Sequence, residues 1–217
     1  MSETSNNIHE KEPNGNIKAL SSQECQKLSK LSESICTIQC NDKSKGTGFL
    51  IKLNFDATKF RVLITNNHII NENNLKVGSQ INLSMNNEDK NNEDKNYEIK
   101  IDDERRAYTN ENYDVTIIEI RENDGIKDDS FLEFDENIYE PNHSFTNQSI
   151  YLLHYPKSEE NSFSKGLINS VDENNGYIEY VCQRNLGSSG GPLINSNYKV
   201  IGIQKQTSNK GNGNLLN

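Results

Sequence analysis

The stretch Gly187-Ser188-Ser189-Gly190-Gly191-Pro192 lies between two apolar runs and surrounds a pair of serines with three glycines. Glycine adopts backbone conformations that other residues avoid, so it lets backbone N–H groups turn toward a reacting oxygen. The pattern therefore indicates a nucleophilic serine, Ser189, beside an oxyanion hole. A tight turn between two strands uses the same residue types, so the interpretation needs catalytic partners elsewhere in the chain.

The order of candidate partners along the chain separates two designs of serine hydrolase. A Gly-x-Ser-x-Gly pattern also marks the nucleophile elbow of α/β-hydrolases, in which the acid and the histidine follow the serine. Residues 190–217 contain no His, Asp or Glu, which excludes that design. The order His, Asp, Ser is available instead, because His68 follows one apolar run and Asp114 opens the next.

Five blocks of the chain resemble the trypsin-like peptidases of the chymotrypsin clan. They are GTGFLI at 46–51, VLITNNH at 62–68, YDVTIIEI at 113–120, GSSGGPLIN at 187–195 and VIGI at 200–203. In spacing the chain is most similar to the HtrA-type and other minimal branches. The resemblance covers about residues 33–205 and implies an all-β fold. It predicts two antiparallel six-stranded β-barrels, the chymotrypsin-like double barrel, with the active site in the cleft between them.

The resemblance implies a role for each site residue. Ser189 is expected to attack a peptide carbonyl, with His68 as general base and Asp114 as the group that orients the imidazole. The backbone N–H groups of Gly187 and Ser189 are expected to form the oxyanion hole. Together these roles predict acyl transfer through a covalent intermediate.

Three further positions bear on substrate and activation. The resemblance places Gln183 at the floor of the primary pocket and Gln204 in its wall, where no carboxylate is available for Lys or Arg. We therefore expect cleavage after a neutral polar or apolar residue. Secreted trypsins carry Asp at the position of Ser188, where it pairs with a new N-terminal amine. Ser188 cannot form that ion pair, so no activation by cleavage is expected.

Composition changes along the chain predict its organisation. The N-terminal segment is polar and charged, which is typical of disorder, and a short helix is expected at 22–31. The polar sequence after residue 205 leaves open whether the second barrel is complete. The predicted segments are a disordered 1–20, a helix plus first barrel at 21–125, a linker at 126–148 and a second barrel at 149–217.

The predicted helix and the cysteines add detail. Cys25, Leu28 and Leu31 recur at helical spacing and are expected to face the first barrel. Cys36 and Cys40 fall on one face of a predicted strand, so buried thiols are expected. The spacing of all four cysteines matches neither the bridges of trypsins nor a metal site. His154 is expected to be a structural or surface residue within a strand.

Charge and hydropathy limit the partners. A formal charge of −9 and a pI near 5.0 argue against nucleic acid. No apolar run approaches the roughly 20 residues that span a bilayer, and the N-terminus lacks an apolar signal sequence, so a cytoplasmic location is expected. No cofactor or metal is expected.

Two functions are compatible with this pattern. The first is an intracellular serine endopeptidase acting on a protein or peptide substrate. The alternative is a catalytically silent protease-fold module that binds peptides or protein partners, since fold does not fix function. The oligomeric state stays open.

Overall fold

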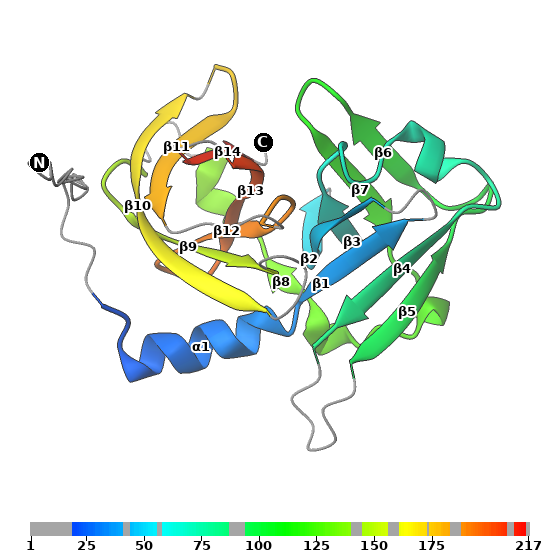
Figure 1. Ribbon diagram of the computed structural model, residues 1–217, viewed down its shortest axis with the longest axis horizontal. Helices are drawn as coiled ribbons and strands as arrows, with labels where there is room; N and C mark the ends of the chain where they lie inside the picture. Colours follow the sequence, from blue (N-terminus) through cyan, green and yellow to red (C-terminus); the bar gives the residue numbers. More distant parts are fainter. Residues whose placement is uncertain are drawn as a thin grey trace, which may run out of the picture.

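Two curled antiparallel β-sheets lie side by side, and the α-helix α1 (Ser22–Ser32) runs beneath the second of them (Figure 1). The computed structural model describes residues 19–40, 44–55, 58–86, 94–139, 145–155, 161–172, 174–182, 188–207 and 211–215. The predicted all-β, chymotrypsin-like double barrel is confirmed, but only the second sheet has the predicted six strands; the first is an eight-stranded curled sheet.

The first sheet has the strand order β5-β4-β1-β2-β3-β7-β6, and β8 pairs in parallel with β2. Each neighbouring pair along that order is antiparallel. Its strands are β1 (Ile35–Cys40), β2 (Lys45–Phe55), β3 (Thr58–Thr65), β4 (Gln80–Met85), β5 (Lys95–Lys100), β6 (Ala107–Asn110), β7 (Val115–Glu119) and β8 (Leu132–Glu133).

The second sheet is a closed barrel of strand order β10-β11-β14-β13-β12-β9. Closure depends on β14 (Gly211–Leu215), which pairs with β11 and β13 and lies in the polar tail whose role the sequence leaves open. The tail therefore completes the second barrel. The other strands are β9 (Ser149–His154), β10 (Ser162–Asp172), β11 (Tyr177–Cys182), β12 (Pro192–Asn195) and β13 (Val200–Thr207).

Apolar side chains form one cluster inside each sheet and a third between them. Alternate residues of a strand point to opposite faces, so a strand covered on both faces is buried throughout. Strand β3 shows this: Leu63 packs inside the first sheet, whereas Val62 and Ile64 join the cluster between the sheets. Leu153 and Ile203 enter the same cluster from the second barrel. This shared cluster fixes one barrel against the other and so positions a site at their junction.

Helix α1 packs mainly against β9 and β10 of the second barrel, whereas the sequence predicts that it faces the first. Its N-cap is Ser21, whose side chain and backbone exchange hydrogen bonds with Glu24 in a capping box. The other carboxylate oxygen of Glu24 accepts from Tyr151 OH at 2.6 Å and Lys165 Nζ at 2.7 Å. These donors, Lys165 first, lower the pKa of Glu24. Leu28 is fully buried between the sheets.

A turn separates β5 from β6. The Arg105 side chain is only 3% exposed and pairs with Asp124, which is 6% exposed, at 2.8 Å. Its guanidinium and Nε groups also donate to the carbonyls of Lys100 and Glu119. This buried cation ends the strand, because satisfying it requires a loop to fold around the side chain.

The predicted linker contains short elements, among them β8. Phe134 forms an isolated bridge with Val200, and Asp135 accepts a hydrogen bond from Asn195 in the second barrel. Because β8 of the linker also pairs with β2, the linker contacts both sheets. The 3-10 helices of the described residues are η1 (Glu72–Leu75), η2 (Glu122–Asp124), η3 (Asp128–Ser130) and η4 (Glu136–Tyr139).

Candidate active site

His68 lies in a turn that directly follows β3. Two backbone groups fix this turn, since Asn66 O accepts from the N–H of Ile69 at 3.2 Å and of Ile70 at 3.1 Å. Both isoleucines are buried in the first sheet, which anchors the turn from below. The His68 side chain itself stays 50% exposed. A buried turn thus presents a solvent-accessible imidazole.

Asp114 occupies the turn before β7 in a left-handed conformation, with φ 52°. Aspartate is among the few non-glycine residues that tolerate this region. Its N–H donates to Glu111 O at 3.1 Å, and its carbonyl accepts from Asn66 Nδ2 at 2.9 Å. The side chain is 12% exposed. The turns that carry His68 and Asp114 are therefore tied to each other through Asn66.

The carboxylate of Asp114 holds His68 at two points. His68 Nδ1 lies 2.9 Å from Oδ2 and 3.0 Å from Oδ1, and the His68 backbone N–H donates to Oδ1 at 2.9 Å. A carboxylate in this position favours the tautomer with a proton on Nδ1 and stabilises an imidazolium. The pair is arranged as a base and its orienting group.

The segment that carries Ser189 rests against the first sheet. Ser189 O accepts from the N–H of Thr47 at 3.0 Å, and Thr65 Oγ1 donates to Thr47 O at 2.8 Å. Gly190 has φ +84°, and an added Cβ there would overlap Thr47 O. Only glycine satisfies both constraints, which explains this part of the motif. Ser189 is half-buried where the two sheets meet.

Gln204 contacts this segment through its backbone. Its carbonyl accepts from Gly190 N–H at 2.9 Å, and its N–H donates to Gly191 O at 2.8 Å. The Gln204 side chain is fully buried and accepts a hydrogen bond from Tyr180 OH. Burial in the second barrel keeps the Gln204 side chain away from a substrate, whereas the expected role of its strand as the pocket wall stays a prediction.

The remaining predicted site residues are placed as follows. Gly187, of the expected oxyanion hole, and Gln183, of the expected pocket floor, lie outside the described residues. Ser189 and His68 are both described, and no hydrogen bond joins the Ser189 hydroxyl to the imidazole. Within the described ranges the structure therefore brings together His68 and Asp114, with Ser189 on the adjoining sheet.

A second histidine and serine form a pair that sequence reasoning missed. Ser188 Oγ and His154 Nδ1 lie 2.7 Å apart, with exposed fractions of 0% for Ser188 and 2% for His154. Burial is the cause that lowers the pKa of His154 to about 4. A substrate cannot reach this pair, so it is structural, in agreement with the expectation for His154. No sequence pattern links positions 34 residues apart.

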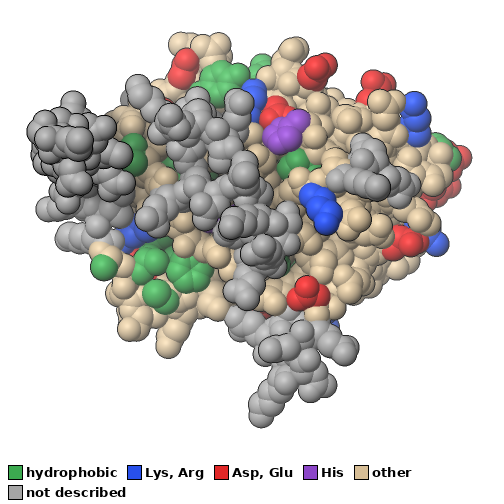
Figure 2. Space-filling view, viewed as in Figure 1, with side chains coloured by type: hydrophobic (Ala, Val, Ile, Leu, Met, Phe, Trp, Pro, Cys, Tyr) green, Lys and Arg blue, Asp and Glu red, His purple; other side chains and the backbone are tan. Residues whose placement is uncertain are grey.

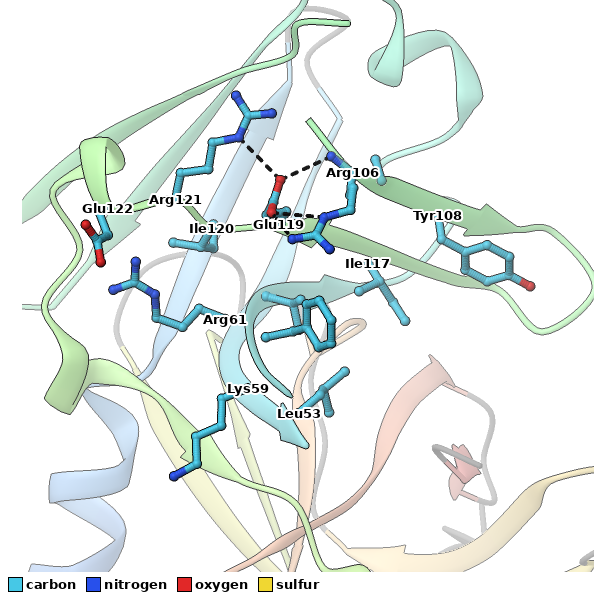
Figure 3. A pocket seen from close by; sticks show the side chains of 13 residues that line it. Leu53, Lys59, Arg61, Arg106, Tyr108, Ile117, Glu119, Ile120, Arg121 and Glu122 are labelled. Carbon is cyan, nitrogen blue, oxygen red and sulfur yellow. Dashed lines mark hydrogen bonds and ion pairs between the residues drawn. The ribbon is translucent and has the colours of Figure 1, made fainter. Parts of the chain in front are cut away.

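A cavity of about 580 Å³ lies elsewhere on the first sheet and contains none of the three predicted catalytic residues. Its lining includes apolar Leu53 and Ile117 and basic Lys59 and Arg61 (Figure 3). Figure 3 also shows Arg106 and Arg121 directed at Glu119, with which both form ion pairs.

The described residues show neither a metal site nor a membrane-spanning helix. No cluster of three or more His, Cys, Asp or Glu side chains is arranged to hold a metal ion there. None of the helices in these residues has the length and hydropathy to cross a bilayer. On the face shown in Figure 2, acidic and basic side chains are interspersed over the described residues.

Comparison with solved structures identifies the same fold. A serine endoprotease from Yersinia pestis superposes with a TM-score of 0.64 at 15% identity, covering 91% of this chain and 64% of that one. Deg5 gives 0.64 at 18% identity and 92% coverage of both chains. An inactive form of the Rv3671c protease of M. tuberculosis gives 0.61 at 19% identity, covering 88% of this chain and 87% of that one. At these identities the likeness concerns the fold alone.

The sequence comparisons supply the family. No curated protein sequence matches the chain. The family model described as the trypsin-like peptidase domain matches residues 46–203, which include His68, Asp114 and Ser189. That range is most of the 217-residue chain. With the double barrel and the His68–Asp114 pair, it shows that the chain belongs to the trypsin-like peptidase domain family.

Proposed function

We propose that this protein is a serine endopeptidase that hydrolyses protein or peptide substrates through an acyl-enzyme. The observation that carries the proposal is the hold of Asp114 on both the ring and the backbone N–H of His68. With Nδ1 engaged, Nε2 is the ring nitrogen left to exchange a proton with a nucleophile. Ser189 is that nucleophile in this proposal, because its sequence context and its place at the sheet junction suit the role.

The proposed reaction has two halves. Ser189 Oγ attacks the peptide carbonyl carbon while His68 Nε2 takes the hydroxyl proton, and the imidazolium then protonates the leaving amine as the C–N bond breaks. Water attacks the resulting ester by the same proton path and releases the acid and free Ser189. Asp114 stabilises the imidazolium in both halves. The N–H groups of Gly187 and Ser189 are proposed to bind the developing oxyanion.

The proposed substrates have a neutral residue before the cleaved bond. Strand β13 beside the nucleophile segment contains no Asp or Glu, so it offers no carboxylate to a Lys or Arg side chain. Its cationic residue, Lys205, donates to Asn112 O at 3.2 Å across the sheet junction. We propose that this bridge helps to hold the Asp114 turn near β13.

We propose that the enzyme works in a reducing compartment such as the cytoplasm. All four cysteines lie in the described residues, and no disulfide joins any of them. Burial raises the pKa of the Cys36 thiol to about 12, which suppresses the reactive thiolate. Cys36 and Cys40 behave as small apolar side chains in the core of the first sheet.

The second candidate function is a protease-fold module that binds peptides or protein partners without turnover. Two observations favour it. Ser189 and His68 are not hydrogen-bonded to each other in the described structure, and the cavity of Figure 3 offers an apolar and basic surface outside the predicted triad. In apo enzymes, however, catalytic hydrogen bonds are often long and shorten only with substrate, so the peptidase remains our first proposal.

An unbiased peptide library tests the two proposals. The library is digested with wild-type protein and with Ser189→Ala, and the cut sites are identified by mass spectrometry. We expect cuts after neutral residues with wild type alone. Dominant cleavage after Lys or Arg would refute the proposed specificity. Cleavage by both proteins would exclude Ser189 as the nucleophile, and cleavage by neither folded protein would favour the binding module.

A further inference from the structure

A buried hydrogen bond fixes the residue immediately before Ser189. Ser188 Oγ and His154 Nδ1 are 2.7 Å apart, and both residues are enclosed in the second barrel. Strand β9 ends at His154, which pairs with Ser162 of β10. The end of a strand in a closed barrel is rigidly held. Ser188 itself lies in a loop and not in a strand, so a hydrogen bond to His154 ties this loop to a rigid part of the barrel.

The other contacts of the segment are made by its backbone. Gly191 N–H donates to Ser188 O at 3.1 Å, which closes a turn around Ser189. Gly190 N–H donates to Gln204 O, and Ser189 O accepts from Thr47 N–H. These bonds fix the backbone of Ser189 and of the two glycines that follow it. The Ser188 side chain adds a hydrogen bond on the other side of the nucleophile, at the residue that precedes it.

The chemistry of the pair suits a fixed hydrogen bond. A neutral imidazole carries one donor and one acceptor nitrogen, and a hydroxyl can serve either of them. His154 Nε2 lies 3.4 Å from Ser164 Oγ, a longer contact on the opposite side of the ring. Because burial lowers the pKa of His154 to about 4, the ring is neutral near pH 7. The hydrogen bond with His154 offsets part of the desolvation cost of the buried Ser188 hydroxyl.

We propose that His154 is a positioning residue for the nucleophile: by holding the Ser188 hydroxyl it fixes the direction of the Ser189 side chain and backbone N–H. This inference rests on the proposed peptidase function, in which Ser189 reacts. His154 takes no part in bond making. It replaces, with a neutral hydrogen bond, the ion pair that Ser188 cannot form.

Four variants separate positioning from general stability. His154→Leu and Ser188→Ala each remove the hydrogen bond. His154→Asn keeps an amide that can donate or accept near the Nδ1 position. Ser164→Ala is the matched control, because it removes a hydroxyl beside the same ring without touching the nucleophile segment. Circular dichroism and urea unfolding establish whether each variant folds. If His154→Leu does not fold, Ser188→Ala tests the same hydrogen bond in its place.

The first readout is amide hydrogen exchange, which does not depend on catalysis. We expect the amides of Gly190 and Gly191 to exchange at least about tenfold faster in His154→Leu and Ser188→Ala, because local opening of this turn becomes easier. Amides elsewhere in the second barrel, such as Ile168, are expected to keep their rates. Unchanged exchange at both glycines in the folded variants would overturn the inference.

The second readout is the rate at which a fluorophosphonate modifies Ser189. Because a misplacement near 1 Å can cost about 100-fold, we expect a fall of about 10- to 100-fold in His154→Leu and Ser188→Ala. His154→Asn and Ser164→Ala are expected to react at nearly the wild-type rate. Wild-type rates in all four variants would overturn the inference. A third outcome separates the two proposals. If the glycine amides exchange faster in His154→Leu and Ser188→Ala but the probe does not label even the wild-type protein, His154 positions the segment and the peptidase proposal is refuted.

Discussion

Gly190 carries a constraint that no side chain could meet. Its φ of +84° lies in the left-handed region, and the space where a Cβ would stand is filled by Thr47 O. The two effects are separable, because Gly125 also has positive φ, +76°, yet has no atom within 4 Å of an added Cβ. The pair of glycines therefore distinguishes backbone strain from close packing of the nucleophile segment.

Replacing these glycines with alanine is expected to cost different amounts of stability. Gly125→Ala should lower the free energy of unfolding by about 1 kcal/mol, through backbone strain alone. Gly190→Ala should lose about 1–3 kcal/mol more, because the new methyl group displaces the segment from Thr47. Urea unfolding measures both. Equal losses would mean that the close approach to Thr47 has no energetic consequence.

Asp114→Asn tests the orienting role of the carboxylate. Asparagine also tolerates the left-handed conformation that Asp114 adopts, so the fold should be retained. The amide favours the wrong tautomer of His68, and in the Ser-His-Asp template this substitution lowers the rate by about 10⁴. We expect a similar fall in fluorophosphonate labelling. Asp128→Asn, at an ion pair with Lys52, should label normally; normal labelling of Asp114→Asn would be inconsistent with the triad.

At the scale of elements, the loop between β5 and β6 depends on the buried Arg105–Asp124 pair. Asp124→Asn would leave a buried guanidinium without its countercharge, which typically costs about 3–5 kcal/mol. The exposed pair Lys30–Glu33 is the control, since Glu33→Gln should change stability by less than about 1 kcal/mol. Chemical denaturation of the two variants checks the difference. A similar small loss in both would show that the loop does not need the ion pair.

Some elements could be predicted from the sequence and others could not. The strands of the five motif blocks are rich in apolar residues, and the buried second half of β3 requires them because both of its faces are covered. The break before β6 depends on Arg105 meeting Asp124, a contact between positions 19 residues apart that no local pattern indicates. Strand β14 consists mostly of Gly and Asn, so only its pairing with β11 and β13 identifies it.

At the scale of the whole molecule, the cluster between the sheets explains why residues from both halves of the chain meet. The same motifs that supply the barrels also supply His68, Asp114 and Ser189, so these positions could be predicted together. His154 could not, because its partnership with Ser188 exists only after the second barrel has closed. The apolar face of helix α1 likewise does not reveal that its main partner is the second barrel, because both sheets contribute to the cluster that contains Leu28.

Burial of His154 also makes the stability of the fold depend on pH. The unfolded chain protonates this histidine near its usual pKa of 6.5, whereas the folded protein does so only near pH 4. The unfolded state therefore binds more protons between these values, and the free energy of unfolding falls as the pH is lowered through this window. The full difference between the two pKa values corresponds to about 3 kcal/mol in the free energy of unfolding.

Unfolding experiments on His154→Asn isolate that contribution. The wild-type protein should lose more stability than this variant between pH 6.5 and pH 4, by up to about 3 kcal/mol. Below pH 4 the two curves should run parallel. The measurement is urea unfolding at a series of pH values. Parallel curves across the entire range would show that the folded protein does not keep His154 neutral.

The most direct measurement for the active site is fluorophosphonate labelling of purified wild-type protein and Ser189→Ala, read by intact mass. The probe forms a covalent adduct with a serine that a neighbouring base has activated. We expect a single adduct on wild type and none on Ser189→Ala, with both proteins folded. An unlabelled wild-type protein, or an adduct that persists in Ser189→Ala, would contradict an activated serine at position 189.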